Sequence, residues 1–160
     1  MEMNMKRRIF VKGSVAAGAL GVAVGAGLLT PKAVLAAWPK EAFEAKKVAD
    51  ALSALYGTGD TTESGDIKIK APDIAENGAV VPITVTVSTD MAGVESISII
   101  AANNPAPLVA SFNMGEGAMG FVSTRIKMGK TGDVIAVVKS GGKLQSNRKE
   151  VKVTIGGCGG

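Results

Sequence analysis

The only cysteine in this 160-residue chain, Cys158, has two glycines on each side. These are Gly156, Gly157, Gly159 and Gly160, which carry no side chains and have the greatest backbone freedom of any residue type. A cysteine thiolate is a strong nucleophile, and the S–S bonds that it forms can later be exchanged or cleaved. The pattern predicts a flexible C-terminal arm with an exposed thiol, suited to the covalent attachment of cargo.

The sequence around Cys158 favours carriage over catalysis. Three extended residues beyond Ile155 give the thiol roughly 10 Å of reach, which lets a slender arm enter a narrow channel in another protein. No Lys, Arg or His lies within three residues of Cys158, and such a cation usually activates a thiol by lowering its pKa. We therefore expect partner enzymes to activate the cysteine, and the chain itself to be no enzyme. A disordered tail without function is the alternative for a glycine-rich terminus.

The residue counts exclude several classes of site. The chain has no histidine and one cysteine, so it cannot supply the four Cys or His ligands of a structural zinc site. It also lacks the residues for attached c-type haem, for Ser-His-Asp or Cys-His catalysis, and for an internal disulfide. We therefore expect no metal and no cofactor. In an oxidising compartment, an unpaired cysteine indicates either intermolecular pairing or a reactive thiol.

Residues 1–36 have the pattern of a removable export signal. A basic stretch that contains Arg7 and Arg8 is followed by an uncharged run, residues 13–30, and the segment ends at Ala36 with the small residues that suit cleavage. The arginine pair, followed by apolar residues and a lysine, is typical of the twin-arginine route, which exports folded proteins. We predict a mature protein in the periplasm. An ordinary secretory signal that contains two arginines is the alternative.

Removal of this signal leaves a mature chain without net charge. Of the 18 basic and 14 acidic residues, five basic and one acidic lie in residues 1–36, so 13 of each sign remain. The basic isoelectric point therefore belongs to the signal, and we expect no nucleic-acid partner. The uncharged run is rich in Gly and Ala and only mildly apolar, so we expect no membrane anchor in the mature form.

The remainder of the chain reads as one helix followed by short strands. A helix is predicted from Trp38 to Tyr56, because Val48, Leu52 and Leu55 form one apolar face at helical spacing. From Ile67 onward, apolar residues alternate with polar ones between turn sequences, which is typical of strands. The predicted strands are 67–70, 80–88, 94–101, 108–114, 120–128, 133–139 and 144–155. The pattern indicates an all-β domain over residues 37–155, an immunoglobulin-like antiparallel β-sandwich preceded by one N-terminal helix, with the flexible arm at 156–160.

Local details of this sandwich carry their own expectations. Pro82 has no N–H for a ladder, so it should lie at a sheet edge or near a strand start. Asn77-Gly78 predicts a hairpin turn. Arg125 and Lys127 should face solvent, without an assigned role. Residues 81–87 should belong to the core, although an edge strand here would offer a pairing surface to a partner.

Several segments of the chain resemble the SoxY family of bacterial sulfur-oxidation proteins. The likeness includes the twin-arginine signal and the helix after Trp38. It extends through APDIAENGAVVP (71–82), NPAPL (104–108), TRIKM (124–128) and the terminal VKVTIGGCGG (151–160). The terminal motif is the most specific of these, and the sequence shows no departure from the family in the arm.

The resemblance implies a covalent carrier in a multienzyme sulfur-oxidation system. Thiosulfate or related sulfur species would be held as an S–S adduct on Cys158. The haem enzyme SoxAX would load the cysteine, SoxB would release sulfate, and a sulfane dehydrogenase would oxidise the remaining sulfur where it is present. SoxZ would be the heterodimer partner, exported together with this chain as the SoxYZ complex. The alternative function is a structural periplasmic subunit whose cysteine only forms intermolecular disulfides.

Overall fold

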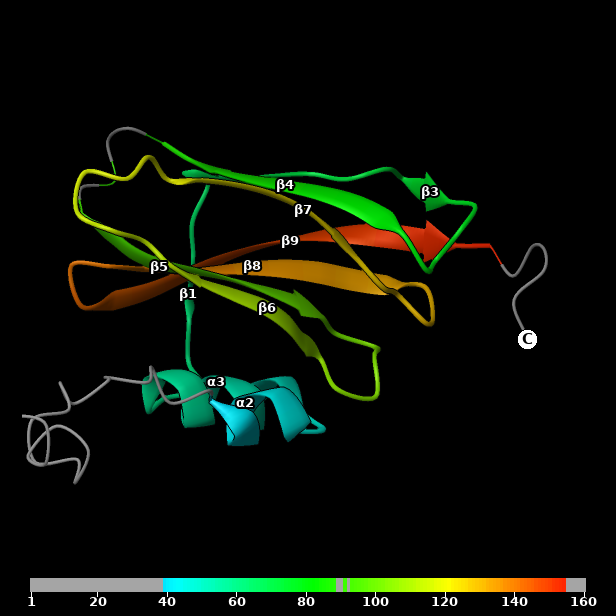
Figure 1. Cartoon of the computed structure of the whole chain (residues 1–160), viewed down its shortest axis with the longest axis horizontal. Helices are drawn as coiled ribbons and strands as arrows, with labels where there is room; N and C mark the ends of the chain where they lie inside the picture. The colour runs from blue at the N-terminus through cyan, green and yellow to red at the C-terminus, as the bar shows by residue number, and fades with distance from the viewer. Residues whose placement is uncertain (1–38, 89–90, 92, 155–160) are drawn as a thin grey trace, which may run out of the picture. The chain divides into compact units, whose positions relative to one another are not determined.

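The computed structural model describes residues 39–88, 91 and 93–154, which form a layered β-domain (Figure 1). A three-stranded sheet and a larger sheet pack against each other, and two helices cover the outer face of the larger sheet (Figure 1). In chain order the elements are α2 (Lys40–Glu44), α3 (Val48–Tyr56), β1 (Thr62–Glu63), β2 (Ile67–Lys70), β3 (Ile74–Ala75), β4 (Val81–Val87), β5 (Val94–Ala101), β6 (Leu108–Asn113), β7 (Phe121–Ile126), β8 (Gly132–Ser140) and β9 (Lys143–Val153).

The sheet topology confirms the predicted fold class. The larger sheet has the order β1-β9-β8-β5-β6, with β3 pairing β9 as well, and the smaller sheet has the order β2-β4-β7. Every one of the seven predicted strands has a counterpart within a few residues of its expected bounds. The two additional strands, β1 and β3, have two residues each and pair with β9 in parallel. The domain is mostly β-structure in two sheets, and a helical region precedes them.

The core lies between the two sheets and follows the alternation seen in the sequence. The inward residues of β4 are buried, and Pro82 and Thr86 between them are exposed. Pro82 is the second residue of β4 and lies opposite Arg125 of β7, beyond the end of β2, whose last residue pairs with Thr84. Because no β2 residue faces Pro82, its missing N–H costs no ladder bond. The predicted position near a strand start is therefore confirmed.

The helical region differs from the single helix that the sequence predicts. Ala45 and Lys47 have extended backbone angles, with ψ of 143° and 148°, and separate α2 from α3. The second helix ends as predicted at Gly57, whose φ of 81° is left-handed. The break lets both helices reach the same apolar patch, since Ala42 of α2 and Leu52 of α3 belong to one buried cluster with residues of the larger sheet.

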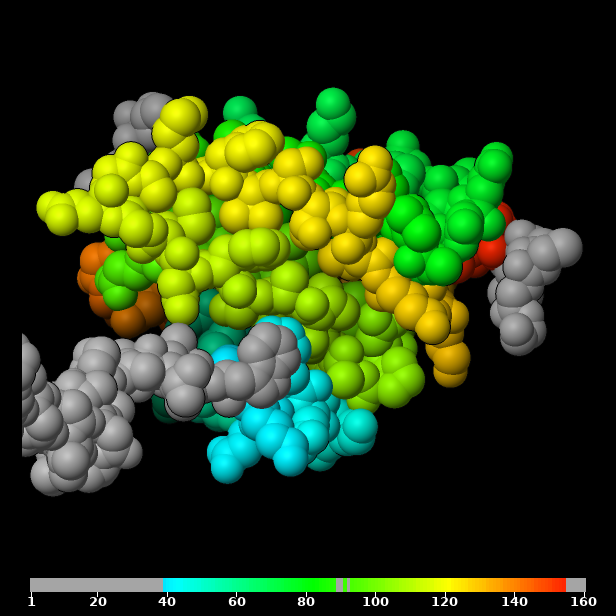
Figure 2. Space-filling model, viewed as in Figure 1, coloured from blue at the N-terminus to red at the C-terminus, as the bar shows by residue number. Residues whose placement is uncertain are grey.

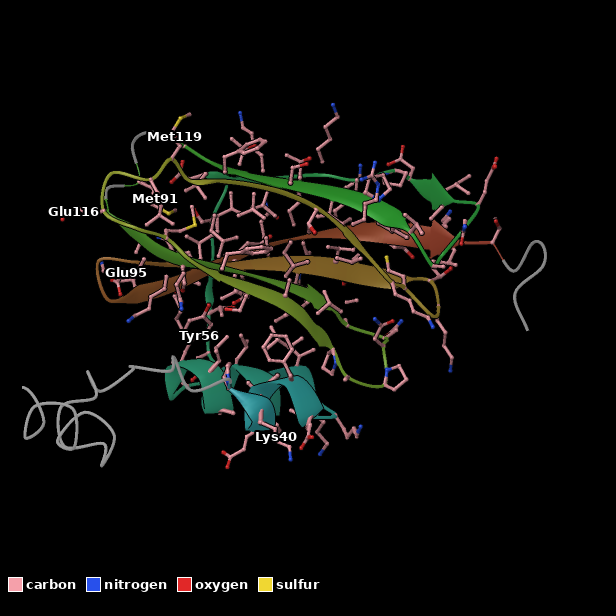
Figure 3. The ribbon with its side chains drawn as sticks, in the orientation of Figure 1. Lys40, Tyr56, Met91, Glu95, Glu116 and Met119 are labelled. Carbon is pink, nitrogen blue, oxygen red and sulfur yellow. The ribbon has the colours of Figure 1, made fainter. Side chains whose placement is uncertain are left out.

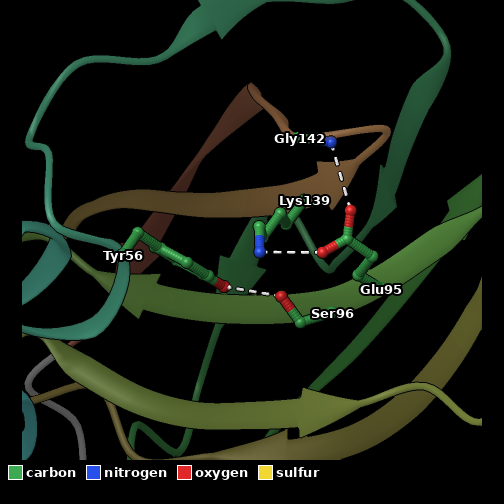
Figure 4. Close-up of polar contacts among 5 residues, drawn as sticks. All are labelled: Tyr56, Glu95, Ser96, Lys139 and Gly142. Atoms are coloured by element: carbon green, nitrogen blue, oxygen red, sulfur yellow. Dashed lines mark hydrogen bonds and ion pairs between the residues drawn. The ribbon is translucent and has the colours of Figure 1, made fainter.

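Two groups of polar contacts, one made by Tyr56 and one by Glu95, join neighbouring segments to β5 of the larger sheet (Figure 4). The hydroxyl of Tyr56, the last residue of α3, lies 3.1 Å from the Ser96 hydroxyl and 2.7 Å from the Ser98 hydroxyl. Beside them, the Lys139 ammonium lies 2.7 Å from the Glu95 carboxylate, which also accepts a hydrogen bond from the Gly142 amide at 3.1 Å. The helix end is thereby fixed to β5, and the β8–β9 turn is tied to the same strand.

This ion pair shifts the pKa of both its members. The hydrogen bond from Lys139, with the one from the Gly142 amide, lowers the pKa of Glu95 below its ordinary value. The hydrogen bond to Glu95 and its negative charge raise the pKa of Lys139. Both side chains are well exposed to solvent, so the pair contributes little to stability. Its structural effect is to keep the β8–β9 turn against β5.

One local expectation from the sequence is wrong, and so is one alternative; the expectation that residues 81–87 belong to the core is confirmed. Asn77-Gly78 makes a turn, with the Ala79 amide bonded to the Asn77 side chain at 2.9 Å, but the strand before it pairs with β9 and not with β4. The turn therefore connects two sheets and is not a hairpin. β4 lies between β2 and β7, so it is not an edge strand that a partner would extend. Arg125 and Lys127 are exposed, as predicted.

Candidate functional site

The residues that the sequence predicts to carry the chemistry and the export signal lie outside the described part of the chain. This holds for Cys158 and its four flanking glycines, and for Arg7 and Arg8 of the predicted signal. The structure describes the strand that leads to the cysteine, β9, and the next residue, Thr154. We refer to residues 151–154 as the arm root, because the predicted arm must start from them.

One side of the arm root is fixed by β8 and the turn before it. Val151 is fully buried and pairs with Gly132 at the start of β8. Two residues later, the Val153 amide donates a hydrogen bond to the Thr131 hydroxyl oxygen at 2.9 Å. The same hydroxyl lies 3.4 Å from the Val153 carbonyl oxygen, to which it donates. Thr131, the residue before β8, therefore extends the pairing with β9 by one step beyond the first residue of β8.

The other side of the arm root is fixed by β3. This strand pairs with β9 in parallel, with Ile74 opposite Lys152. The Lys152 amide donates to the Asp73 carbonyl at 3.0 Å, and the Thr154 amide donates to the Ala75 carbonyl at 3.1 Å. The chain is thus hydrogen-bonded on both sides up to Thr154, close to the predicted end of the ordered strand at Ile155, which lies outside the described residues.

A close backbone approach at Gly78 holds the neighbouring turns against the arm root. The Met128 amide donates to the Gly78 carbonyl at 2.7 Å. A Cβ atom added to Gly78 would overlap the Met128 carbonyl oxygen and would lie 2.8 Å from Cγ1 of Val153. The β3–β4 turn, the β7–β8 turn and β9 meet at Gly78. Because they approach so closely, only glycine fits here without displacement of a neighbour.

Sequence reasoning missed these supporting residues for a physical reason. Thr131 and Gly78 act through contacts with residues more than 20 positions away. Nothing in their local sequence predicts which strand they touch. The signals that were available were the position of Gly78 before a strand and the stretch Lys130-Thr131-Gly132 as turn material. Both indicate turns, and neither indicates the arm root.

A second feature lies at the opposite end of the sandwich. A hollow is lined by Met91, Met114, Met119 and Phe121, beside the last residues of β4, whereas the arm root adjoins the turn before β4. The side chains of Met91 and Met119 lie at this far end, with Glu116 beside them (Figure 3). Met119 is 81% exposed and Phe121 is 51% exposed. The sequence did not predict this hollow, because its methionines come from two separate connections, β4–β5 and β6–β7.

Two further observations concern the described residues as a whole. Among residues 39–88, 91 and 93–154, no group of three or more His, Cys, Asp and Glu side chains is arranged to hold a metal ion. In the same ranges, no helix has the length and apolar character that crossing a membrane requires.

Comparisons with known proteins agree with the resemblance seen in the sequence. The family model described as "Sulfur oxidation protein SoxY" matches residues 52–158. A solved structure of the sulfur carrier protein SoxY from Chlorobium limicola f thiosulfatophilum is 45% identical, with a TM-score of 0.61, and the match covers 73% of this chain and all of that one. The BSP domain of a biofilm associated protein is 19% identical with a TM-score of 0.37, over 65% of this chain and 17% of that one. No curated protein sequence matches the chain.

Proposed function

This chain belongs to the SoxY family of sulfur oxidation proteins, and we propose that it carries sulfur-oxidation intermediates covalently on Cys158. The observation that carries the proposal is the family match, which extends to Cys158 itself and includes a solved sulfur carrier at 45% identity. The family supports a carrier role in sulfur oxidation. The adduct on Cys158, its partners and its location are our inferences.

The arm root supports this function by limiting where the thiol can go. The last described hydrogen bond is made by Thr154, and four residue steps separate it from Cys158. At 3.3–3.6 Å per extended residue, the thiol stays within about 14 Å of a fixed point on the sandwich. A partner enzyme that docks on this end of the domain then meets the thiol at high local concentration.

The proposed chemistry balances if the partners supply the oxidant and the water. The Cys158 thiolate and thiosulfate join in an S–S bond and lose two electrons, which the haem enzyme SoxAX accepts. Hydrolysis by SoxB then releases sulfate, because water supplies the fourth oxygen and two protons, and a persulfide anion stays on the cysteine. A sulfane dehydrogenase would oxidise that remaining sulfur. This chain supplies the thiol and its position, and we propose that it performs no catalysis.

We propose β6 as the surface for the partner SoxZ, in place of β4. β6 is the edge of the larger sheet, and it contains no charged residue and no proline. The Met114 amide donates to the Glu95 carbonyl at 2.9 Å. In an antiparallel ladder, hydrogen-bonded pairs alternate with pairs that are not bonded, so every second residue of β6 counted back from Met114 bonds to β5. The backbone groups of Ser111 and Asn113 therefore point away from β5. Figure 2 shows this edge on the viewer's side of the molecule.

In a monomeric protein, an edge strand with unpaired backbone groups and no charged residue is usually covered by another segment, because it would otherwise pair with the strands of other chains. We propose that SoxZ covers β6, and that the two chains leave the cytoplasm as a folded pair by the twin-arginine route. This would explain why a chain without a cofactor carries such a signal. The mature pair would then function in the periplasm.

Intact mass spectrometry separates the carrier from the alternative, a subunit whose cysteine only forms disulfides. The SoxYZ pair is incubated with thiosulfate and SoxAX, and we expect a thiosulfate adduct on Cys158 in the native chain and none in Cys158→Ser. The variant should keep its fold and its SoxZ partner, because Cys158 lies beyond the hydrogen-bonded root. A native chain that yields only a disulfide-linked dimer, inert to thiosulfate and SoxAX, would overturn the proposal.

A further inference from the structure

The outer face of the three-stranded sheet carries charges of one sign. Side chains alternate across the strands, and the register places Lys68 and Lys70 of β2 and Arg125 of β7 on the same outward face. Between them, the hydroxyls of Thr84 and Ser123 lie 3.1 Å apart. None of the three strands contains Asp or Glu. We call this surface, defined by the three cations, the cationic face.

The cationic face is uncovered by the described residues. The two helices pack on the larger sheet, on the other side of the domain (Figure 1). Nitrogen-tipped side chains project outward from the three-stranded sheet (Figure 3). Lys68, Lys70 and Arg125 are exposed, and the structure shows no ion pair for them with any described residue. In the sequence, Asp66 directly precedes β2 and Asp73 follows Lys70 by three residues, so both flanking acidic residues lie outside the strand.

This face leads toward the arm root. Arg125 is in register with Pro82 at the start of β4, and Lys127, also exposed, follows two residues later. The next residue, Met128, bonds to Gly78, which in turn lies against Val153. The row of cations therefore approaches the point from which the predicted arm departs.

We propose that the cationic face docks an acidic protein surface beside the entrance of the channel that receives the arm. The inference rests on the proposed carrier function and adds the surface that the partner enzymes recognise. Charges at the rim of an interface mainly set the association rate, its salt dependence and the register of docking. The mature chain has no net charge, so this attraction acts at short range, within a Debye length of about 8–10 Å.

The simpler interpretation is that these cations only protect two edge strands from pairing with other chains. Lysine on an edge is a common protective device, and β2 and β7 are both edges. Protection requires charge but not one particular sign, since acidic residues repel a neighbouring strand equally well. A face with only basic residues, in a chain with 13 charges of each sign after residue 36, is what an acidic partner surface would select.

Charge reversal with a matched control tests the proposal. We would compare the SoxYZ pair carrying Lys68→Glu, Lys70→Glu and Arg125→Glu with a pair carrying Lys46→Glu, Lys47→Glu and Lys143→Glu, which changes three exposed cations elsewhere by the same net charge. Immobilised SoxB and SoxAX are the probes, and association rates are measured at about 50 mM and about 500 mM salt, where the screening length changes about threefold.

We expect the face variant to associate at least about tenfold more slowly at low salt, with most of the difference lost at high salt, and the control to match the native pair. Equal rates for the face variant and native pair, or an equal loss in the control, would overturn the inference. As a further probe, we would use anionic lipid vesicles; a face variant that binds these vesicles more weakly but associates with SoxB and SoxAX at the native rate would also overturn the inference. Reaction of Cys158 with a small neutral disulfide reagent should be unchanged in both variants, so failure of this docking surface is distinguishable from failure of the carrier thiol.

Discussion

Replacement of Gly78 by alanine tests whether the turns around the arm root are packed as closely as the structure shows. The new Cβ would overlap the Met128 carbonyl oxygen and would lie 2.8 Å from Cγ1 of Val153. Neither neighbour is the free end of a flexible side chain, because one is backbone and the other branches from a paired strand. The β3–β4 turn must therefore move away, and the 2.7 Å hydrogen bond from Met128 to Gly78 must lengthen or break.

The expected loss of stability combines three contributions. Overpacking costs about 1–3 kcal/mol, and loss of one hydrogen bond adds about 1 kcal/mol. Alanine in place of glycine restricts the unfolded chain, which offsets about 0.4–1 kcal/mol. The net result is a decrease of about 2 kcal/mol in the free energy of unfolding. For a domain of this size, that corresponds to a decrease of roughly 8 °C in Tm.

Gly65→Ala is the matched control, because a Cβ at Gly65 meets no atom within 4 Å and its backbone is not left-handed. This control should be neutral or slightly stabilised. Thermal unfolding gives the stability, and amide hydrogen exchange gives the location, with faster exchange expected at Val153 and Thr154 in Gly78→Ala. Equal stability of the two variants would refute the close packing. A destabilised Gly78→Ala with native exchange at the arm root would refute its connection to β9.

Two further predictions concern other parts of the domain. The lowered pKa of Glu95 means that its ion pair with Lys139 stabilises the fold above the ordinary carboxyl pKa of about 4.3, and that this contribution disappears as the pH falls through the lowered value. The raised pKa of Lys139 extends the contribution to above about pH 10.4, and it is lost as the pH rises through the raised value. Native and Glu95→Gln proteins should therefore show only a small difference in unfolding free energy at neutral pH, because the pair is exposed, and they should converge at both extremes; a large or constant difference would contradict this. Asn113→Pro removes an outward N–H of β6 and should weaken SoxZ binding about tenfold or more in titration calorimetry, whereas Ser123→Pro on the edge of the other sheet should not.

The strands were predictable from the sequence because each depends on local alternation. β4 shows this most clearly, since its four inward residues are buried and the residues between them are partly or fully exposed. The helix break at Ala45 was not predictable, because the apolar spacing continues through it. The break depends on the shape of the sheet below, where Ala42 and Leu52 share one cluster. Tertiary packing decided the backbone there, and local propensity did not.

The chemistry of the candidate site stays a prediction from the sequence, and the support of the site comes from the structure. One cysteine among four glycines predicts the reactive group without knowledge of the fold. The two-residue strand β3 has no alternation long enough to detect, and its parallel pairing with β9 spans more than 70 positions. The same holds for the contact between Thr131 and Val153. Features that depend on register between distant segments require the structure.

The pairing of β3 with β9 also determines how strongly the arm concentrates its thiol. With the chain fixed at Thr154, a reach of about 14 Å confines Cys158 to a half-sphere with an effective concentration on the order of 0.3 M. Without the bonds to Asp73 and Ala75, the last anchor would be Val153, whose amide bonds to the Thr131 hydroxyl, and five residue steps would give a reach of about 17 Å. The volume grows with the cube of this reach, so the concentration would fall about twofold. In the proposed carrier, the two-residue strand β3 would thus raise the thiol concentration at a docked enzyme about twofold, because it moves the last anchor from Val153 to Thr154.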